Sequence, residues 1–403
     1  MIKMSVLEKY ENLIGRKSVK KLRMKALKYQ HMRILHVNST KFGGGVAEIL
    51  QNMIPMMHEL ELDAIWKTFS APENFFEITK KMHNALQGNM EVSFSHDEIS
   101  LYKNQAKSTF NQINPSGDYV IIHDPQPCPV IDEVDEKEGK WLWRCHIDTS
   151  NPNPQAWKMI ADYLPKYDAL IFTKKEYAQQ DIRKSIFRIP PSIDPFSEKN
   201  REISEERAKE IVEKFVKRDK PLISQISRFD PWKDPFGVID AYRIVKKNMD
   251  LSLVLIGSLA EDDPEGVEYL KKVQNYANSD PDIHIFTNLD GVHDIEVNAF
   301  QKISNVILQK SIKEGFGLTV TEALWKETPV IGGNVGGIKL QIEDGKNGFL
   351  VDTVEECAQK IEYLLKNPKI AQKMGKRGKE KVKEQFLLIN HVNNYLNLFE
   401  KLL

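Results

Sequence analysis

Two glutamates bracket a glycine-rich segment in the second half of the chain, Glu314-Gly-Phe-Gly-Leu-Thr-Val-Thr-Glu322. Its glycines let a loop bring backbone N–H groups close to a ligand, and a helix beginning near Leu318 directs its positive end at an anion. A retaining glycosidase would need two carboxylates about 5–5.5 Å apart, whereas five helical residues already rise about 7.5 Å. The spacing favours two separate roles around a sugar diphosphate. The alternative is an ordinary helix start with a solvated acid.

Two cations in a short loop form a second candidate site. Arg228 and Lys233 follow the apolar run 222–226. A planar guanidinium fork and the point charge of an ammonium both suit phosphate oxygens. Ligands of open parallel sheets bind beyond the carboxyl ends of the strands, so we expect this loop and the Glu314 segment to serve one ligand. Solvated surface cations are the alternative.

Glycines also follow the first apolar run of the chain. Gly43, Gly44 and Gly45 stand between the run 33–38 and a helical period that begins at Val46. The segment matches neither the P-loop pattern nor Gly-x-Gly-x-x-Gly. Close approach of the backbone to a ligand and a plain flexible turn both stay open.

Acidic and histidine side chains end two further apolar runs, in His123-Asp124 and in His146-Ile-Asp148. Asp124 can accept hydrogen bonds from sugar hydroxyls, and His146 can orient or polarise a hydroxyl near neutral pH. Two histidines and two aspartates also invite a metal site. No third-ligand pattern accompanies them, so no metal is predicted.

Short apolar runs alternate with helical periods along the chain, which is typical of parallel sheets covered on both faces. We expect an α/β fold of two doubly wound Rossmann-like domains facing across a cleft. The expected strands are 33–38, 118–123, 141–146, 168–173, 222–226, 251–256, 283–286, 306–309 and 329–331. The expected helices include 202–218, 236–247, 265–276, 354–365 and 370–385.

Three prolines between 190 and 195 interrupt this rhythm, because proline continues neither a helix nor a central strand. The predicted parts are a basic helical extension (1–32), an N-terminal Rossmann-like domain (33–190), a linker (191–199), a C-terminal Rossmann-like domain (200–385) and a C-terminal helix (386–403) that packs back on the first domain. The first 33 residues hold ten Lys or Arg. A packed helical extension is favoured over a membrane or nucleic-acid arm.

The composition excludes several classes of protein. The 403 residues carry 57 Lys+Arg and 57 Asp+Glu, so no net charge draws the chain to nucleic acid. The three cysteines form no Cys-x-x-Cys pair, which argues against a zinc or disulfide framework and for a cytoplasmic setting. No apolar run approaches the roughly 18 residues that span a bilayer.

Together these features resemble glycosyltransferase family 4, retaining enzymes of the GT-B architecture, over about residues 33–390. The most specific marks are Ser227-Arg228 with Lys233, the Glu-x7-Glu element, Pro-Val-Ile-Gly-Gly at 329–333 and Asp-Gly-Lys-Asn-Gly at 344–348. In that family the Arg and Lys bind the donor diphosphate, the first Glu contacts donor-sugar hydroxyls and the second binds the ribose. The resemblance implies those roles for Arg228, Lys233, Glu314 and Glu322.

The segment His36-Val-Asn-Ser-Thr-Lys-Phe-Gly-Gly-Gly-Val-Ala-Glu48 is similar to the trehalose glycosyltransferring synthases. That likeness implies reversible, retaining transfer from UDP- or ADP-glucose to free glucose, giving α,α-trehalose and nucleoside diphosphate. A partial likeness to trehalose-phosphate synthases implies that Asp124 and His146 handle the sugars. Another family 4 hexosyltransferase, a nucleotide-sugar epimerase and a non-catalytic nucleotide-binding protein are the alternatives.

The predicted site falls into three overlapping sets. The residues expected to act in the transfer are Glu314, His146, Asp124, Arg228 and Lys233. The donor is expected to contact Arg228, Lys233, Glu314, Gly315, Phe316, Gly317, Leu318 and Glu322. The acceptor is expected near Gly43, Gly44, Gly45, Asp124 and His146. No tightly bound cofactor is expected, while Mg²⁺ beside the diphosphate and a homodimer are left open.

Overall fold

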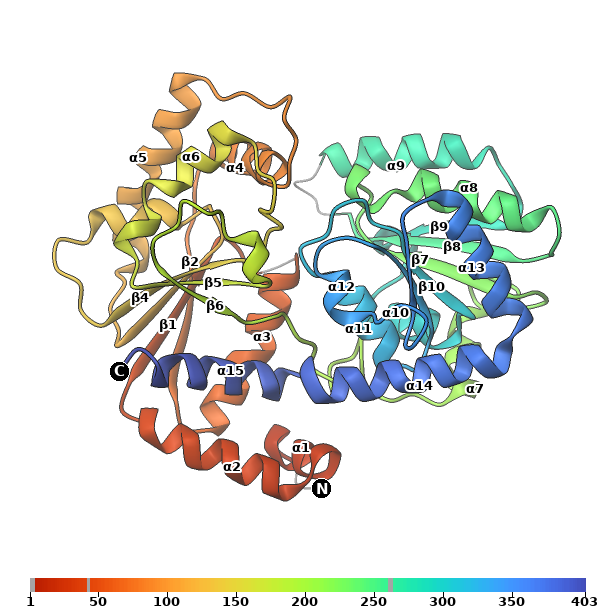
Figure 1. The fold of residues 1–403 in the computed structure, drawn as a ribbon, viewed down its shortest axis with the longest axis horizontal. Helices are drawn as coiled ribbons and strands as arrows, with labels where there is room; N and C mark the ends of the chain where they lie inside the picture. The colour runs from red at the N-terminus through yellow and green to blue at the C-terminus, as the bar shows by residue number, and fades with distance from the viewer. Residues whose placement is uncertain (1–3, 42–43, 260–263) are drawn as a thin grey trace. The chain divides into compact units, whose positions relative to one another are not determined.

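The computed structural model describes residues 4–41, 44–259 and 264–403, and the chain divides into two compact units (Figure 1). The first unit comprises Met1–Pro191 and Leu388–Leu403, and the second comprises Ser192–Leu387. The boundary falls directly after the proline pair at 190–191. Each unit has a hydrophobic core of its own.

A parallel sheet organises the first unit. Within the described residues it has six strands in the order β2-β1-β3-β4-β5-β6. The strands are β1 Arg33–Asn38, β2 Asp63–Thr68, β3 Tyr119–His123, β4 Lys140–Cys145, β5 Ala169–Phe172 and β6 Ser185–Arg188. Since β1 lies between β2 and β3, the winding direction reverses there, which defines a doubly wound Rossmann-like sheet.

Seven described helices belong to the first unit. They are α1 Val6–Ile14, α2 Arg16–Ala26, α3 Gly44–Glu59, α4 Glu73–Leu86, α5 His96–Ile113, α6 Pro154–Ala161 and α15 Leu388–Glu400, with short 3₁₀ turns η1 Leu27–Tyr29, η2 Cys128–Glu133, η3 Leu164–Lys166 and η4 Lys175–Tyr177. The chain returns to the sheet after each connection, so all the strand pairs are parallel.

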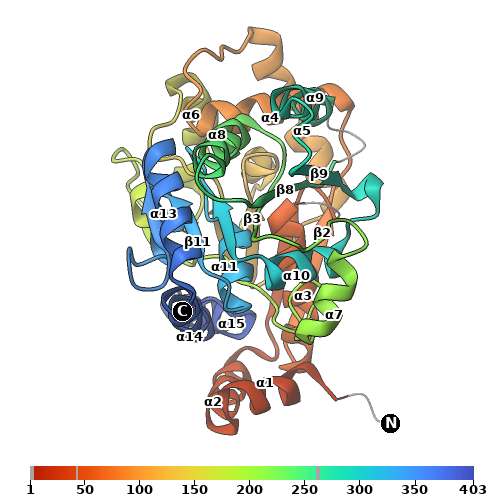
Figure 2. The same cartoon turned by 90° about the vertical axis from the view of Figure 1, so that its right-hand side faces the viewer.

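The basic N-terminal segment forms two helices of the first unit, α1 and α2, which lie side by side (Figure 2). They turn their apolar residues inward, and Leu7, Tyr10 and Val19 are buried. The Glu59 carboxylate at the end of α3 accepts hydrogen bonds from the first backbone N–H groups of α1, at 2.8 Å. This contact ties the segment to the unit.

The last helix of the chain, α15, also packs in the first unit. The Phe399 ring stacks on Tyr119 of β3 with ring centroids 4.0 Å apart. The Lys25 ammonium of α2 reaches Asn393 at 2.9 Å. Helices from both ends of the chain therefore pack within the first unit.

A second parallel sheet organises the second unit. In the part of the chain that the structure describes, its six strands have the order β12-β11-β10-β7-β8-β9. The strands are β7 Leu222–Ile226, β8 Ser252–Gly257, β9 Ile283–Thr287, β10 Val306–Gln309, β11 Val330–Gly333 and β12 Phe349–Val351. The winding direction reverses between β7 and β10, so the loops after these two strands flank the point where doubly wound sheets bind ligands.

The helices of the second unit cover this sheet. They are α7 Glu205–Val212, α8 Pro235–Lys246, α9 Pro264–Ala277, α10 Asp294–Ile303, α11 Leu318–Trp325, α12 Ile338–Gln341, α13 Val354–Lys366 and α14 Pro368–Gln385, with 3₁₀ turns η5 Pro231–Lys233 and η6 Asn288–Asp290. The helix expected over 202–218 is shorter than predicted. Ser204 caps its start, and the charged residues after Val212 form turns.

Three of the described strands are absent from the expected set, β2, β6 and β12. β12 has only three residues. β2 and β6 are edge strands whose residues are mostly only partly buried or exposed. Because an edge strand lacks a second neighbour, its sequence carries polar residues and no continuous apolar run.

Candidate functional site

Glu314 lies in the loop that joins β10 to α11. Gly317 precedes the helix with a φ of +81°, a backbone conformation that residues other than glycine rarely adopt. A Cβ added at Gly317 would lie 3.3 Å from the Glu314 Cγ atom. The loop therefore folds back tightly, and α11 begins directly beside the Glu314 side chain.

The Glu314 carboxylate is buried and paired with Lys233. Its Oε2 atom lies 2.5 Å from the Lys233 Nζ atom, and it accepts weaker hydrogen bonds from Ser311 and Gln309, both at 3.2 Å. Burial by itself would raise the pKa of Glu314, but the Lys233 ammonium and these hydrogen bonds outweigh it and lower the pKa. The carboxylate is thus charged, with a cation held against it.

Lys233 owes its position to the loop after β7. Asp230 caps the turn η5 by accepting the Lys233 backbone N–H at 3.2 Å. The Gln225 side chain, at the end of β7, donates to the Lys233 carbonyl at 2.7 Å. The lysine is consequently anchored, like Glu314, at the carboxyl ends of the central strands.

A second buried ion pair joins the same two loops. The Lys310 ammonium, directly after β10, pairs with the Asp234 carboxylate that caps α8. Lys310 is 6% exposed. Sequence analysis did not single out Lys310, although a lysine at the end of an apolar strand is a detectable signal.

Arg228 takes a different position from Lys233. Its guanidinium pairs with Asp230 at 3.3 Å, and its side chain is 57% exposed. Among the described residues, no hydrogen bond or ion pair joins Arg228 to Glu314. The two predicted phosphate ligands therefore share a loop, but only Lys233 contacts the glutamate.

Glu322 is buried inside α11 and is not a solvated helix acid. Gln301 donates to its Oε2 atom at 2.7 Å, and the Lys199 ammonium lies 3.9 Å from its Oε1 atom. Glu322 is 3% exposed. The structure gives the two glutamates different partners.

The Gln341 side chain holds the glycine-rich loop by hydrogen bonds, and the sequence analysis did not single it out. The Gln341 amide donates to the carbonyls of Phe316 at 2.6 Å and Gly317 at 3.2 Å, while accepting from Thr321 at 2.5 Å. The Phe316 ring packs against Phe386 and is 4% exposed. Phe316 is therefore a core residue, and only its backbone belongs to the loop.

Helix α11 presents its amino end beside this loop. The N–H groups of the first helical turn, which begins at Leu318, have no carbonyl partner four residues earlier in the helix. Gly337 crosses close to Gly315, where an added Cβ would lie 2.4 Å from the Gly315 carbonyl oxygen. The predicted donor residues of positions 314–318 thus form one compact turn with a helix amino end and a buried lysine.

The glycines after β1 are only partly described. Gly43 lies outside the described residues. Gly44 begins α3 with a φ of +75°, and a Cβ added to it would meet nothing within 4 Å. Gly45 continues the first turn of the helix.

Asp124 and His146 come together at the carboxyl ends of β3 and β4. The Asp124 carboxylate accepts the His146 backbone N–H at 2.7 Å, and Asp124 has a φ of +64°. Burial raises the pKa of Asp124 to about 7, although the His146 N–H and the nearby Arg144 lower it. Both side chains are half-buried, so they border the surface at the strand ends.

His146 is the last of three imidazoles that lie in a row. His36 of β1 contacts His123 of β3, and His123 contacts His146, each with nitrogen atoms 3.0 Å apart. The Arg144 Nε atom lies 3.0 Å from the His146 Nε2 atom. Sequence analysis missed Arg144, whose signal was a charge within the apolar strand β4.

Neither a metal-binding cluster nor a membrane-spanning helix is present in the described ranges. No group of three or more His, Cys, Asp or Glu side chains is arranged there to hold a metal ion. In the imidazole row the ring nitrogens face one another and a guanidinium. No described helix is both long and apolar enough to cross a membrane.

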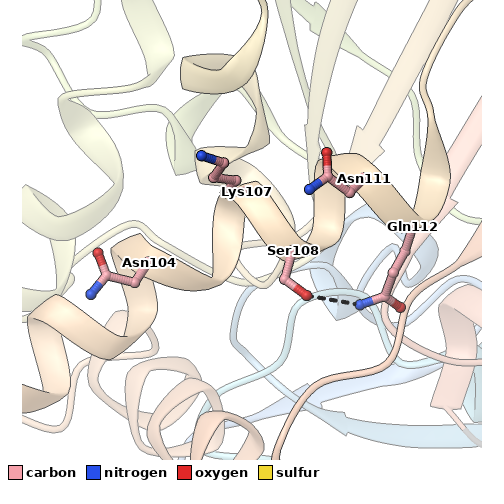
Figure 3. Close-up of a pocket in the computed structure, with 5 residues that line it drawn as sticks. All are labelled: Asn104, Lys107, Ser108, Asn111 and Gln112. Carbon is pink, nitrogen blue, oxygen red and sulfur yellow. Dashed lines mark hydrogen bonds between the residues drawn. The ribbon is translucent and has the colours of Figure 1, made fainter.

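A shallow surface depression on α5 lies apart from these residues (Figure 3). It is lined by Asn104, Lys107, Ser108, Asn111 and Gln112. The last of them stands at the end of α5, which leads into the amino end of β3. The depression therefore lies toward the amino ends of the strands, away from the site residues at their carboxyl ends. It offers only amide, hydroxyl and lysine groups of one helix face.

Comparison with known proteins follows the division into two units. Residues 36–179 match the family described as "Trehalose synthase, N-terminal domain", and residues 206–381 match "Glycosyl transferases group 1". The chain is 49% identical over 396 residues to the trehalose synthase of Thermococcus litoralis, covering 97% of this chain and 96% of that protein. It is 45% identical over 403 residues to that of Rubrobacter xylanophilus, covering 98% and 96%.

Solved structures share the fold at low sequence identity. A sucrose-phosphate synthase from Thermosynechococcus elongatus aligns with a TM-score of 0.71 at 16% identity, covering 92% of this chain and 99% of that one. An α,α-trehalose-phosphate synthase (UDP-forming) from Burkholderia xenovorans aligns with a TM-score of 0.73 at 13% identity, covering 92% and 99%. These similarities show the two-domain GT-B fold.

Proposed function

The chain belongs to the trehalose synthase family of group 1 glycosyltransferases, and from this we propose that it transfers glucose from UDP- or ADP-glucose to free glucose. The products are α,α-trehalose and nucleoside diphosphate, and the reaction is reversible. The observation that carries the donor half of the proposal is the buried Lys233–Glu314 pair beside the amino end of α11.

The cation and the helix end suit a diphosphate. We propose that the donor phosphates bind beside Lys233, with Arg228 and the N–H groups of α11 completing the anion site. Arg228 is exposed and can swing to a ligand, while Lys233 is already fixed. These charges stabilise the departing diphosphate, an electrostatic contribution that in enzymes amounts to several kcal/mol.

Glu314 and Glu322 hold the two ends of the donor in this proposal. A charged carboxylate only accepts hydrogen bonds, so Glu314 suits the hydroxyls of the transferred glucose. Glu322 lies inside α11 with Lys199 and Gln301, and we assign it to the ribose. Asp124 and His146 of the first unit, with Gly44 and Gly45, are assigned to the acceptor glucose.

The transfer proposed is a same-face displacement with retention. The bond from the anomeric carbon to the phosphate oxygen breaks, and a bond to the acceptor oxygen forms on the same face. The acceptor proton passes to the departing phosphate oxygen. No enzymatic nucleophile is used, since Glu314 is ion-paired to Lys233 and hydrogen-bonded by Ser311 and Gln309. Mg²⁺ would enter only as a companion of the diphosphate.

Incubation with ¹³C-labelled glucose and either UDP-glucose or ADP-glucose tests the proposal. We expect a labelled, non-reducing disaccharide by NMR, and Glu314→Gln should reduce its formation by about 10² or more. Glu343→Gln, at an exposed glutamate of the same unit, is the matched control.

The outcomes of this assay separate the alternatives. Absence of the disaccharide with both donors would refute the proposal. Product with another acceptor would indicate a different hexosyltransferase. Conversion of the donor alone would indicate an epimerase, and binding of UDP without turnover would indicate a non-catalytic nucleotide-binding protein.

A further inference from the structure

Arg144 is a buried cation without a carboxylate partner among the described residues. It is 0% exposed in the middle of the first unit, and its Nη2 atom donates to the Ile189 carbonyl at 2.9 Å. Its guanidinium lies 5.7 Å from the centre of the Tyr395 ring. A buried charge is costly unless it is paired or hydrogen-bonded, so the remaining contact of Arg144 needs an explanation.

That contact is with His146. The Arg144 Nε atom lies 3.0 Å from the His146 Nε2 atom. A guanidinium has donors only and no acceptor. His146 Nε2 must therefore supply a lone pair, which places the single ring proton on Nδ1 and leaves the ring neutral.

The assignment extends to the neighbouring histidine. The His123 Nδ1 atom also lies 3.0 Å from His146 Nε2. Since Nε2 carries no proton, His123 must donate through its own Nδ1–H. Its Nε2 atom then accepts from His36 Nδ1 at 3.0 Å. All three rings thus carry their proton on Nδ1, and the row points its donors toward His146.

We infer that Arg144 is a positioning residue that holds His146 as the neutral Nδ1–H tautomer, so that His146 meets the substrate as a hydrogen-bond donor and not as a proton acceptor. The identity of that substrate oxygen, a sugar hydroxyl, rests on the proposed function. The tautomer itself rests on the contact of the Arg144 Nε atom with His146 Nε2. The fixed charge of Arg144 behind the ring also strengthens the Nδ1–H donor.

The surroundings keep the ring neutral. Burial, followed by the charge of Arg144 and the proximity of His391, lowers the pKa of His146 well below its usual range. Burial and Arg144 likewise lower the pKa of His36 to about 3. The titratable and charged groups that face this cluster are His36 of β1, His123 and Asp124 after β3, Arg144 of β4, and His391 and Tyr395 of α15. A His146 that titrates near neutral pH would contradict the inference.

Long-range ¹H–¹⁵N NMR of histidine-labelled protein tests the tautomer directly. We assign the His146 ring by its loss in His146→Gln. In the wild-type protein we expect a protonated Nδ1 and an unprotonated Nε2, unchanged from about pH 6 to about pH 8, a range in which an ordinary histidine titrates. A proton on His146 Nε2, or titration within that range, would overturn the inference without any variant at Arg144.

Arg144→Leu removes the donor. We expect the His146 ring to change tautomer or to titrate, and kcat to fall by about 10² while the affinity for the nucleotide stays within twofold. Arg144→Lys, which can still donate, should restore part of the wild-type spectrum. Arg188→Leu, at the exposed end of β6, is the matched control and should leave the spectrum and kcat unchanged.

A folded Arg144→Leu protein with the wild-type His146 spectrum would refute the positioning role. The spectra do not depend on which sugar is transferred. If the product assay fails while the tautomer is as expected, the proposed function is wrong and the role of Arg144 stands. If the tautomer differs while trehalose forms, the role of Arg144 is wrong and the proposed function stands.

Discussion

Replacing Lys233 by methionine isolates the energetics of the buried ion pair. The methionine keeps the apolar stem of the lysine but removes the ammonium that lies 2.5 Å from Glu314. Only the hydrogen bonds from Ser311 and Gln309, both 3.2 Å long, then remain for the carboxylate. The variant leaves a charged group that is 8% exposed without its counter-ion.

The expected loss follows from that geometry. Removing one partner of a buried pair costs about 3–5 kcal/mol, because the remaining charge is uncompensated. Ser311 and Gln309 still serve Glu314, so we expect the lower end, about 3 kcal/mol in the free energy of unfolding at neutral pH.

The loss should depend on pH, with a definite sign. In the wild-type protein the pKa of Glu314 is lowered, so its pairing stabilises the fold above the unfolded-state pKa and the stabilisation is lost as pH falls through the folded value. In Lys233→Met, burial dominates and raises the pKa. The penalty in the free energy of unfolding then grows as pH rises from the unfolded-state pKa of 4.5 toward the raised pKa of the folded variant. The difference between the two proteins is therefore smallest in acid.

Urea denaturation at about pH 5 and about pH 7.5 measures this difference. Lys346→Met, which breaks an exposed pair with Glu343 at 2.9 Å, is the matched control and should cost about 0–1 kcal/mol. Adding Glu314→Gln to Lys233→Met should recover stability at pH 7.5. An equal loss at both pH values, or a loss within that of the control, would refute the reasoning.

Three further predictions concern the site residues. Gly317→Ala and Gly291→Ala both force a side chain into a φ of +81°, and each should lower the free energy of unfolding by about 1–2 kcal/mol. Only Gly317→Ala, whose Cβ would press on Glu314, should weaken nucleotide-diphosphate binding as measured by calorimetry. Burial raises the pKa of Asp124 from its ordinary value of 3.8 to about 7, so Asp124 lowers stability progressively as pH rises between these values. Asp124→Asn should remove this part of the pH dependence from the free energy of unfolding. Glu322→Gln should weaken UDP or ADP binding by about tenfold, the loss of roughly 1.4 kcal/mol, and an unchanged Kd for both nucleotides would exclude its ribose role.

The sequence alone placed much of the second unit. Continuous apolar runs predicted β7 and β10 within their observed bounds, because a strand buried on both faces tolerates few polar residues. The rule that ligands meet the carboxyl ends of parallel strands then selected the loops that hold Lys233 and Glu314. Their ion pair confirms that these loops meet.

Other features needed the tertiary structure, because they depend on which strands become neighbours. Nothing local links Lys233 to a carboxylate 81 positions away, nor Gln341 to the carbonyl of Phe316. The row that ends at Arg144 and His146 arises only when β1, β3 and β4 align in one sheet. Apolar periodicity and strand-end chemistry are local, so sequence determines them; strand order, register and burial are not, and only the fold decides which charges are paired and which nitrogen of a histidine carries its proton.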